Sequence, residues 1–131
     1  MCRVAGRESE GWLRREDIDN FPCEDLRTIN QLWLNYSNGK FGFSVQKEIY
    51  ESLGGTRKYN QKVWEKFGVR VGRRKGGSWL VYSDLTFNIG APKAHLPGCL
   101  IKVSGEYCWT LMHGLNCYLF SLTQRLVTCS I

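Results

Sequence analysis

The residues of this chain best suited to binding chemistry are the cations and aromatics of residues 72–82. This segment opens with GRRKGG, which is basic and rich in glycine but lacks the Gly-Lys-Ser/Thr ending of a phosphate-binding loop. The charged and aromatic side chains here are Arg73, Arg74, Lys75, Trp79 and Tyr82. Cations on phosphates and aromatic rings under bases would bind single-stranded nucleic acid. The same set would hold a planar macrocycle with two carboxylates, and a solvated basic loop without a ligand is the third interpretation. Composition does not separate the three.

A second group of aromatic residues lies in the connection 39–43. Asn38 and Gly39 tolerate the left-handed backbone that ends a helix, and Ser44 is suited to cap the next helix. Phe41 and Phe43 are therefore expected in a short linker between two helices. They either fill the angle between these helices or also line a pocket for a flat apolar ligand.

No catalytic or metal centre is predicted. Serine, cysteine and histidine residues are scattered without a Gly-x-Ser-x-Gly turn or a nucleophile and base in pattern, so we expect a protein that is not an enzyme. Cys108, His113 and Cys117 would offer three metal ligands, but the spacing supplies no fourth. The six cysteines form no Cys-x-x-Cys pair, and without a secretory signal we expect buried thiols rather than disulfides.

Composition and charge indicate a globular chain of one domain. Its 131 residues are 43% hydrophobic and 23% charged, which is ordinary for such a protein. The net charge of +6 favours an anionic partner, whether nucleic acid, an acidic lipid surface or a carboxylate-bearing small molecule. The N-terminus has no apolar run and carries acidic residues, so we expect a cytoplasmic protein, or a stromal one if a plastid transit peptide is missing from this sequence.

Helical periodicity predicts most of the elements that must position these side chains. Helices are expected within 14–20, over 23–37 and over 44–53, and from a cap at Asn60 to Phe67, with Gly68 as the stop. The inner face of the helix over 23–37 is expected to carry Leu26, Ile29, Leu32, Trp33 and Tyr36.

The helical pattern breaks after Val69. Residues 69–83 are expected to form a loop or weak hairpin, residues 84–89 a turn of helix or a strand, and residues 91–97 an extended path because of their prolines. An apolar helix is expected over 109–126, and its polar residues argue against a membrane span, although peripheral membrane association stays open. These patterns predict a mainly α fold of five or six helices.

Three sequence words, in this order, resemble the signatures of the Genomes Uncoupled Four family. They are FP-x-x-DL-x-TI-x-x-LW at 21–33, SNG-x-FGFSVQ at 37–46 and AP-x-x-HLP at 91–97. The resemblance spans residues 12–97 and implies a compact helical domain with a cupped groove and a loop-rich lip. It also implies a protein that binds protoporphyrin IX or magnesium protoporphyrin IX without catalysis, and that stimulates magnesium chelatase by serving the large subunit of that enzyme.

The resemblance further implies where a porphyrin would lie. Carried over by position, the walls, floor and opposing loop of the groove are lined by Ile18, Phe21, Phe41, Phe43, Tyr82, Leu85 and Phe87. The cations expected toward the rim are Arg73, Arg74, Lys75 and Lys102. These cations would contact propionates only loosely, so stacking is expected to outweigh charge.

The chain also departs from the family pattern. Family domains usually begin with two more helices before the position of Trp12, so we expect a partly missing scaffold, marginal stability and self-association. The expected organisation is a flexible leader at 1–10, a tetrapyrrole-binding-like helical core at 11–98, and a tail at 99–131 with one apolar helix packed on the core. A ligand-free interaction or signalling module of the same fold is the alternative, and nucleic-acid binding is the least expected function.

Overall fold

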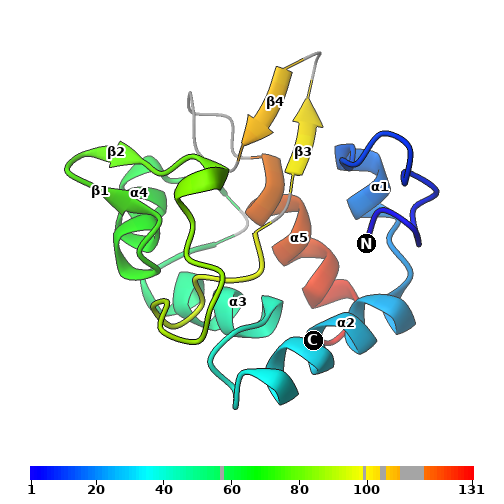
Figure 1. Ribbon diagram of the computed structural model, residues 1–131, viewed down its shortest axis with the longest axis horizontal. Coiled ribbons are helices and arrows are strands. Elements are labelled where there is room, and N and C mark those ends of the chain that lie inside the picture. Colours follow the sequence, from blue (N-terminus) through cyan, green and yellow to red (C-terminus); the bar gives the residue numbers. More distant parts are fainter. Residues whose placement is uncertain (57, 99, 104–105, 110–116) are drawn as a thin grey trace.

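Helices form most of the regular secondary structure, as the periodicity predicts (Figure 1). The computed structural model describes residues 1–56, 58–98, 100–103, 106–109 and 117–131. Its α-helices are α1 (Arg15–Asp19), α2 (Cys23–Tyr36), α3 (Phe43–Ser52), α4 (Gln61–Arg70) and α5 (Cys117–Thr128). The remaining elements are the strands β1 (Arg74–Lys75), β2 (Ser78–Trp79), β3 (Leu100–Val103) and β4 (Glu106–Trp109), and the 3₁₀ turn η1 (Tyr82–Asp84). The prediction of a mainly α fold is confirmed.

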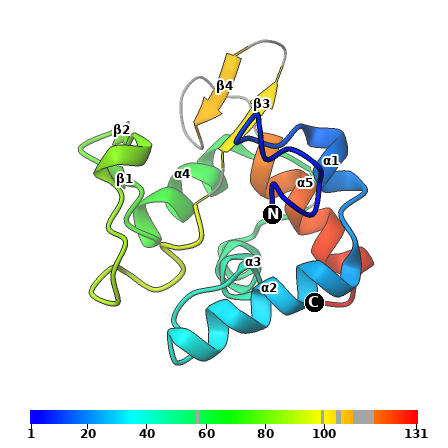
Figure 2. The ribbon, with the colours of Figure 1, turned by 45° about the vertical axis from the view of Figure 1, so that its right-hand side comes forward.

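Helix α5 lies in the middle of the helical packing. It contacts α1, α2 and α3, and it runs beside them in both ribbon views (Figures 1 and 2). Leu122 and Leu126 of α5 are fully buried. The main core comprises Leu13, Ile18, Phe21, Leu26, Phe43, Val45, Tyr50, Phe67, Val71, Ala94, Leu122, Leu126 and Cys129. Residues from both ends of the sequence therefore share one core.

Two antiparallel hairpins interrupt the helical pattern. The β1–β2 hairpin, with Arg74 opposite Trp79, is the weak hairpin expected in residues 69–83. The β3–β4 hairpin, with Leu100 opposite Trp109, was not predicted. Its β-branched and aromatic residues, such as Ile101, Val103 and Tyr107, are typical of strands.

The tail helix is shorter than predicted. The expected helix over 109–126 corresponds to α5, which begins at Cys117, whereas Trp109 belongs to β4 and residues 110–116 lie outside the described residues. Within the part of the chain that the structure describes, every helix is too short or too polar to cross a membrane.

The end of α2 follows the predicted pattern. Asn38 and Gly39 have φ values of 52° and 75°, the left-handed conformation expected at a helix stop. The Ser37 hydroxyl donates to the Trp33 carbonyl at 2.6 Å and accepts from the Phe41 amide at 2.8 Å. This serine closes α2 and fixes the direction of the linker that follows.

The predicted cap of α3 is wrong. The helix begins at Phe43, and its N-cap is Gly42, whose φ of 144° favours glycine. The acceptor for the Ser44 amide is Asn30 Oδ1 on the neighbouring helix α2, at 3.0 Å. The capping group therefore comes from 14 residues earlier in the chain rather than from Ser44 itself.

The start of α4 was predicted correctly, but its end was not. Asn60 Oδ1 accepts from the Val63 amide at 3.2 Å, as expected of a cap. Gly68 does not stop the helix, which continues to Arg70. A Cβ at Gly68 would lie 2.1 Å from the ring of Trp79, so this glycine makes room for the β1–β2 hairpin rather than ending α4.

The outer part of α2 is more exposed than predicted. Leu32 is 49% exposed and Tyr36 87% exposed, although both were assigned to the inner face. The helix lies at the edge of the molecule and fully buries only Leu26 and Asn30 (Figure 1). The apolar stripe on α2 is therefore wider than the part of the helix that neighbouring elements cover.

A disulfide joins the start of α2 to the end of α5. Cys23 and Cys129 are bonded, with their Cα atoms 5.2 Å apart, which corrects the expectation of free thiols at these two positions. The Arg27 guanidinium donates to the Cys129 carbonyl at 2.8 Å and strengthens the same junction. Cys2 is a half-buried free thiol, and the side chains of Cys99, Cys108 and Cys117 lie outside the described residues.

Candidate functional site

The segment 80–97, which we call the lip, carries several exposed apolar residues and includes the loop that was predicted to face the groove. Val81, Phe87 and Ile89 are 41%, 53% and 58% exposed, whereas Leu85 is only 6% exposed. Exposed apolar groups that are grouped on one loop are typical of a binding surface. Leu85 anchors the lip, and Phe87 and Ile89 are presented to solvent.

The C-terminal part of the lip is fastened to the linker 37–42. The Ala94 amide donates to the Lys40 carbonyl at 2.9 Å, and the Gly42 amide donates to the Leu96 carbonyl at 3.2 Å. The Lys40 ammonium donates to the Ile89 carbonyl. Two sequence words that are some 50 residues apart thus form one hydrogen-bonded unit.

Helix α3 and the residue before β1 hold the same part of the lip from below. Gln46 is fully buried, and its amide nitrogen donates to the carbonyls of Ala94 and Pro97 at 3.1 and 3.0 Å. Arg73 donates to the carbonyls of His95 and Pro97, at 2.9 and 2.7 Å. The carbonyls of Ala94, His95 and Pro97 therefore all accept from side chains outside the lip.

Arg73 is not at the rim of a groove, which corrects the sequence prediction. Its side chain is 2% exposed and lies among the largest fully buried side chains. A buried guanidinium needs hydrogen-bond acceptors, and the two lip carbonyls supply them. Arg73 is thus a structural anchor of the lip.

The other predicted cations differ in their surroundings. Arg74 is half-buried, lies 3.7 Å from a Glu65 carboxylate oxygen and stands 6.0 Å from the centre of the Trp79 ring. Lys75 is exposed on β1. The side chain of Lys102 lies outside the described residues, although its backbone belongs to β3.

Trp79 faces α4 rather than solvent. Its ring centre lies 5.5 Å from that of Trp64, and it covers Gly68. Trp64 in turn stacks on Phe67, with ring centres 5.5 Å apart. Trp79 is half-buried, and its packing on Trp64 and Gly68 leaves less of the ring for stacking on a nucleic-acid base.

The linker aromatics support the lip. Phe41 is 4% exposed and packs with Ala91 and Leu96 of the lip, beside the half-buried Trp33. The rings of Trp33 and Phe41 meet edge to face, with centres 6.3 Å apart. Phe43 points instead into the main core and is fully buried.

This packing gives a stability prediction for Trp33. Replacement of Trp33 by alanine should lower the free energy of unfolding by about 2 kcal/mol, less than for a fully buried tryptophan, because the side chain is only half-buried. Urea unfolding measures the change. Tyr36→Ala is the matched control on the same helix, because its ring is 87% exposed, and it should alter stability by less than about 0.5 kcal/mol. Equal effects of the two substitutions would contradict this packing.

The structure brings only part of the predicted set to the surface. Ile18, Phe21 and Phe43 belong to the main core, and Phe41 and Leu85 are also nearly closed off from solvent. Phe87 is 53% exposed. The Tyr82 side chain lies outside the described residues, and its backbone forms part of η1.

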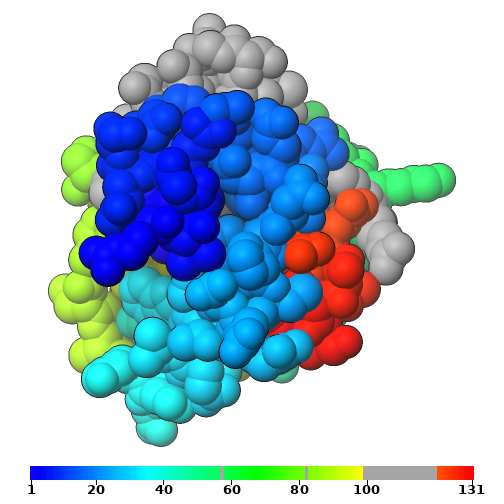
Figure 3. All heavy atoms as spheres, turned by 90° about the vertical axis from the view of Figure 1, so that its right-hand side faces the viewer, coloured from blue at the N-terminus to red at the C-terminus, as the bar shows by residue number. Residues whose placement is uncertain are grey.

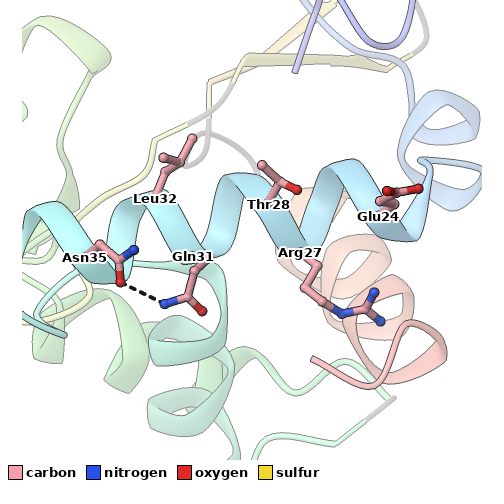
Figure 4. Close-up of a pocket in the computed structure, with 6 residues that line it drawn as sticks. All are labelled: Glu24, Arg27, Thr28, Gln31, Leu32 and Asn35. Atoms are coloured by element: carbon pink, nitrogen blue, oxygen red, sulfur yellow. Dashed lines mark hydrogen bonds between the residues drawn. The ribbon is translucent and has the colours of Figure 1, made fainter.

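Two surface hollows lie away from the lip. One, of about 380 Å³, runs along the outer face of α2 and is lined by Glu24, Arg27, Thr28, Gln31, Leu32 and Asn35 (Figure 4). The other, of about 400 Å³, lies between the N-terminal residues and α1, where Val4, Arg7 and Phe21 are among its lining residues. Figure 3 shows this face, with the first residues of the chain packed beside α1 and α2. Sequence reasoning did not identify either hollow, because it assigned Leu32 to the inner face of its helix and Phe21 to the wall of the porphyrin groove.

Charged residues in the described part of the chain form no metal site. No three histidine, cysteine or acidic side chains converge there as ligands. The acidic residue Asp17 of α1 interacts with neighbours in sequence instead. It accepts a hydrogen bond from the Arg14 amide at 2.8 Å and forms an ion pair with Arg7 at 3.2 Å.

The sequence and structure are similar to those of known proteins. Residues 1–111 match a family model described as GUN4-like. Among curated relatives, the Ycf53-like protein of Synechocystis sp. is 37% identical over 100 residues, covering 74% of this chain and 40% of the relative. A ycf53 protein of Porphyra purpurea is 38% identical over 102 residues, with 76% and 40% covered. The chain thus spans about two fifths of the length of these relatives. The tetrapyrrole-binding protein of Arabidopsis thaliana chloroplasts is 27% identical over 73 residues, covering 54% of this chain and 25% of that protein.

The fold is also similar to solved structures. The structure of GUN4 from Chlamydomonas reinhardtii superposes with a TM-score of 0.57 at 26% identity and covers 96% of this chain and 70% of that one. The ligand-free structure of Arabidopsis thaliana GUN4 gives a TM-score of 0.56 at 24% identity, with 72% and 64% covered. The second likeness concerns the fold alone.

Proposed function

Because this chain belongs to the GUN4-like family, we propose that it binds a tetrapyrrole, protoporphyrin IX or magnesium protoporphyrin IX, and does not transform it. The observation that carries the proposal is the junction of the two family words at 37–46 and 91–97. They are hydrogen-bonded through Lys40 and Gly42, and together they support a lip with exposed apolar side chains. A flat macrocycle is the kind of ligand that such apolar surface would remove from water.

The contacts proposed for the porphyrin come from the lip and the linker. Tyr82 and Phe87 would stack on the macrocycle, and Phe41 and Leu85 would support the lip from below. Arg74, Lys75 and Lys102 are the cations proposed for the propionates. Ile18, Phe21 and Phe43 would contribute by shaping the core under the groove, since all three side chains are 1% exposed or less.

The proposed role is to deliver or sense the porphyrin. We place its action at magnesium chelatase, through the large porphyrin-binding subunit, in the cytoplasm or in the plastid stroma. A relative named as a chloroplast protein and relatives from a cyanobacterium and a red alga support these locations.

A ligand-free interaction module is the second candidate. The burial of Phe41 and Leu85 favours it, because these side chains have little surface left for a macrocycle. Titration of the chain with protoporphyrin IX, followed by tryptophan emission, separates the two functions. Quenching that saturates in the micromolar range would support binding, and no quenching at tens of micromolar would leave the interaction module. A short single-stranded DNA is the control, because salt-sensitive DNA binding without porphyrin binding would favour a nucleic-acid function.

Tyr82→Ala is expected to weaken porphyrin binding at least about tenfold, which corresponds to about 1.4 kcal/mol. The reason is that a ring stacked on the macrocycle removes apolar area that no other group replaces. The matched control is Tyr59→Ala, which deletes another tyrosine that is 42% exposed and lies before α4, and which should leave the affinity unchanged. Normal binding by Tyr82→Ala, together with loss of binding in an Arg74/Lys75 double alanine variant, would show that charge rather than stacking holds the ligand.

A further inference from the structure

His95 is buried, yet both of its ring nitrogens are engaged. The side chain is 1% exposed; Nδ1 lies 2.7 Å from the Val71 carbonyl oxygen, and Nε2 lies 3.0 Å from the Thr86 amide nitrogen. A carbonyl only accepts and a backbone amide only donates, so Nδ1 must carry the proton and Nε2 must be bare. The geometry therefore requires the neutral imidazole in one tautomer.

The His95 ring joins the end of α4 to the lip, two segments that share no strand pairing. Val71 is the C-cap of α4, where its amide donates to the Phe67 carbonyl and its own carbonyl is left for His95, and Thr86 lies in the lip. On either side of Thr86 the buried Leu85 points inward and the exposed Phe87 presents its ring to solvent. The Thr86 amide is thus the point at which His95 fixes the orientation of the lip residues proposed to meet the ligand.

The surroundings of His95 disfavour a positive charge. Burial lowers the pKa of its imidazole below the usual value of 6.5, and the cations Arg73 and Lys75 lower it further, while the bond to the Val71 carbonyl acts in the opposite direction. Arg73, which follows α4, donates to the carbonyl of His95 itself, and Lys75 lies on β1. From the lip, Thr86 faces the ring with an uncharged amide.

The direction of the pH effect follows from this arrangement. In the folded protein the imidazole stays neutral at a pH where the unfolded chain is already protonated. Stability is therefore complete above the usual histidine pKa of 6.5 and falls as the pH drops below that value toward the lowered folded pKa. Protonation of Nε2 would set its N–H against the N–H of Thr86, so the bond to the lip cannot survive it.

We propose that His95 is a positioning residue that latches the lip, and that its protonation releases Thr86 and weakens porphyrin binding at acidic pH. The ligand part rests on the function proposed above, whereas the latch itself does not. The histidine of the AP-x-x-HLP word would thus have a regulatory task that is separate from contact with the ligand.

The latch is tested first on the wild-type chain without ligand. We expect nitrogen NMR to show a neutral His95 with the proton on Nδ1 at about pH 7.5, and the Thr86 amide to gain solvent exchange as His95 titrates below the usual value. His113→Gln removes the other histidine of the chain and assigns the signals. Slow exchange of Thr86 at every pH, or an Nε2-protonated ring at neutral pH, would overturn the latch without touching the proposed function.

Porphyrin titrations then test the consequence. His95→Gln keeps a carbonyl acceptor and has no proton to gain, so it should bind with a weak dependence on pH. Between about pH 7.5 and about pH 5.5, the wild type and His113→Gln should lose at least about threefold more affinity than His95→Gln does, because only a fraction of the chains keeps a latched lip. The propionates titrate equally in all three experiments. Parallel pH profiles would overturn the link to binding, and absence of binding in every chain at neutral pH would overturn the proposed function while the latch is still read from Thr86.

Discussion

Reduction of the Cys23–Cys129 disulfide is expected to lower the free energy of unfolding by roughly 4 to 5 kcal/mol, because the bond closes a loop across 106 residues. An unfolded chain that is free of this link gains conformations that the oxidised chain cannot reach. Cys129 is also 3% exposed within the main core, so reduction loosens the end of α5 beside Leu126. Unfolding midpoints in urea, with and without a thiol reductant, measure the loss.

The free thiol supplies the control for this prediction. Cys2→Ser should leave the midpoint and its response to reductant unchanged, because Cys2 is a free cysteine. A Cys23→Ala/Cys129→Ala variant should match the reduced wild type and show no further response. A peptide map of the unreduced chain that lacks the Cys23–Cys129 cross-link, or equal midpoints in both states, would contradict the prediction.

Arg73→Ala is expected to cost at least about 3 kcal/mol of stability, because it leaves the carbonyls of His95 and Pro97 buried without their charged donor. The cavity left by a side chain that is 2% exposed adds to this loss. Thermal and urea unfolding measure the effect, and porphyrin binding should fall only as far as the folded fraction and the lip geometry fall.

Arg74→Ala is the matched control, since it removes the same kind of side chain one position later. Arg74 makes a longer ion pair with a partly exposed Glu65, so its loss should cost less than about 1 kcal/mol. Arg73→Lys should be intermediate, because one ammonium replaces a fork that serves two carbonyls. If Arg73→Ala were as stable as Arg74→Ala, the guanidinium would not be the anchor of the lip.

Features whose causes lie within a few residues were predictable from the sequence. The stop after α2 follows from Ser37, Asn38 and Gly39, and the start of α4 follows from the Asn60 cap. Both depend on backbone preferences and on acceptors that local side chains bring with them. The mainly α fold rests on the same kind of information.

Features that depend on partners distant in sequence were predicted wrongly or not at all. The cap of α3 comes from Asn30 on another helix. Gly68 makes room for the ring of Trp79 and does not end its own helix. The periodicity of α2 could not show that Leu32 and Tyr36 lack a covering element. In each case the deciding contact is tertiary, and the local pattern fits two outcomes equally well.

The candidate site divides in the same way. Sequence words identified the linker and the lip, which the structure joins by hydrogen bonds. The basic, glycine-rich run at 72–77 is typical of solvent-exposed loops, so Arg73 was expected at the surface. Only carbonyls 22 and 24 residues further along reveal that Arg73 is internal. The role proposed for His95 likewise depends on two backbone groups, at Val71 and Thr86, that no spacing rule connects to it.

The packing of α1 on α5 has a consequence for how the protein is made. The first helix finds its partner only when the last one has been synthesised, and the Phe21 carbonyl waits for Arg125, 104 residues later. Until then the nascent chain leaves the apolar side chains of Ile18, Phe21 and Leu26 uncovered. Until α5 has been synthesised, we expect these side chains to be accessible to chaperones that shield apolar segments.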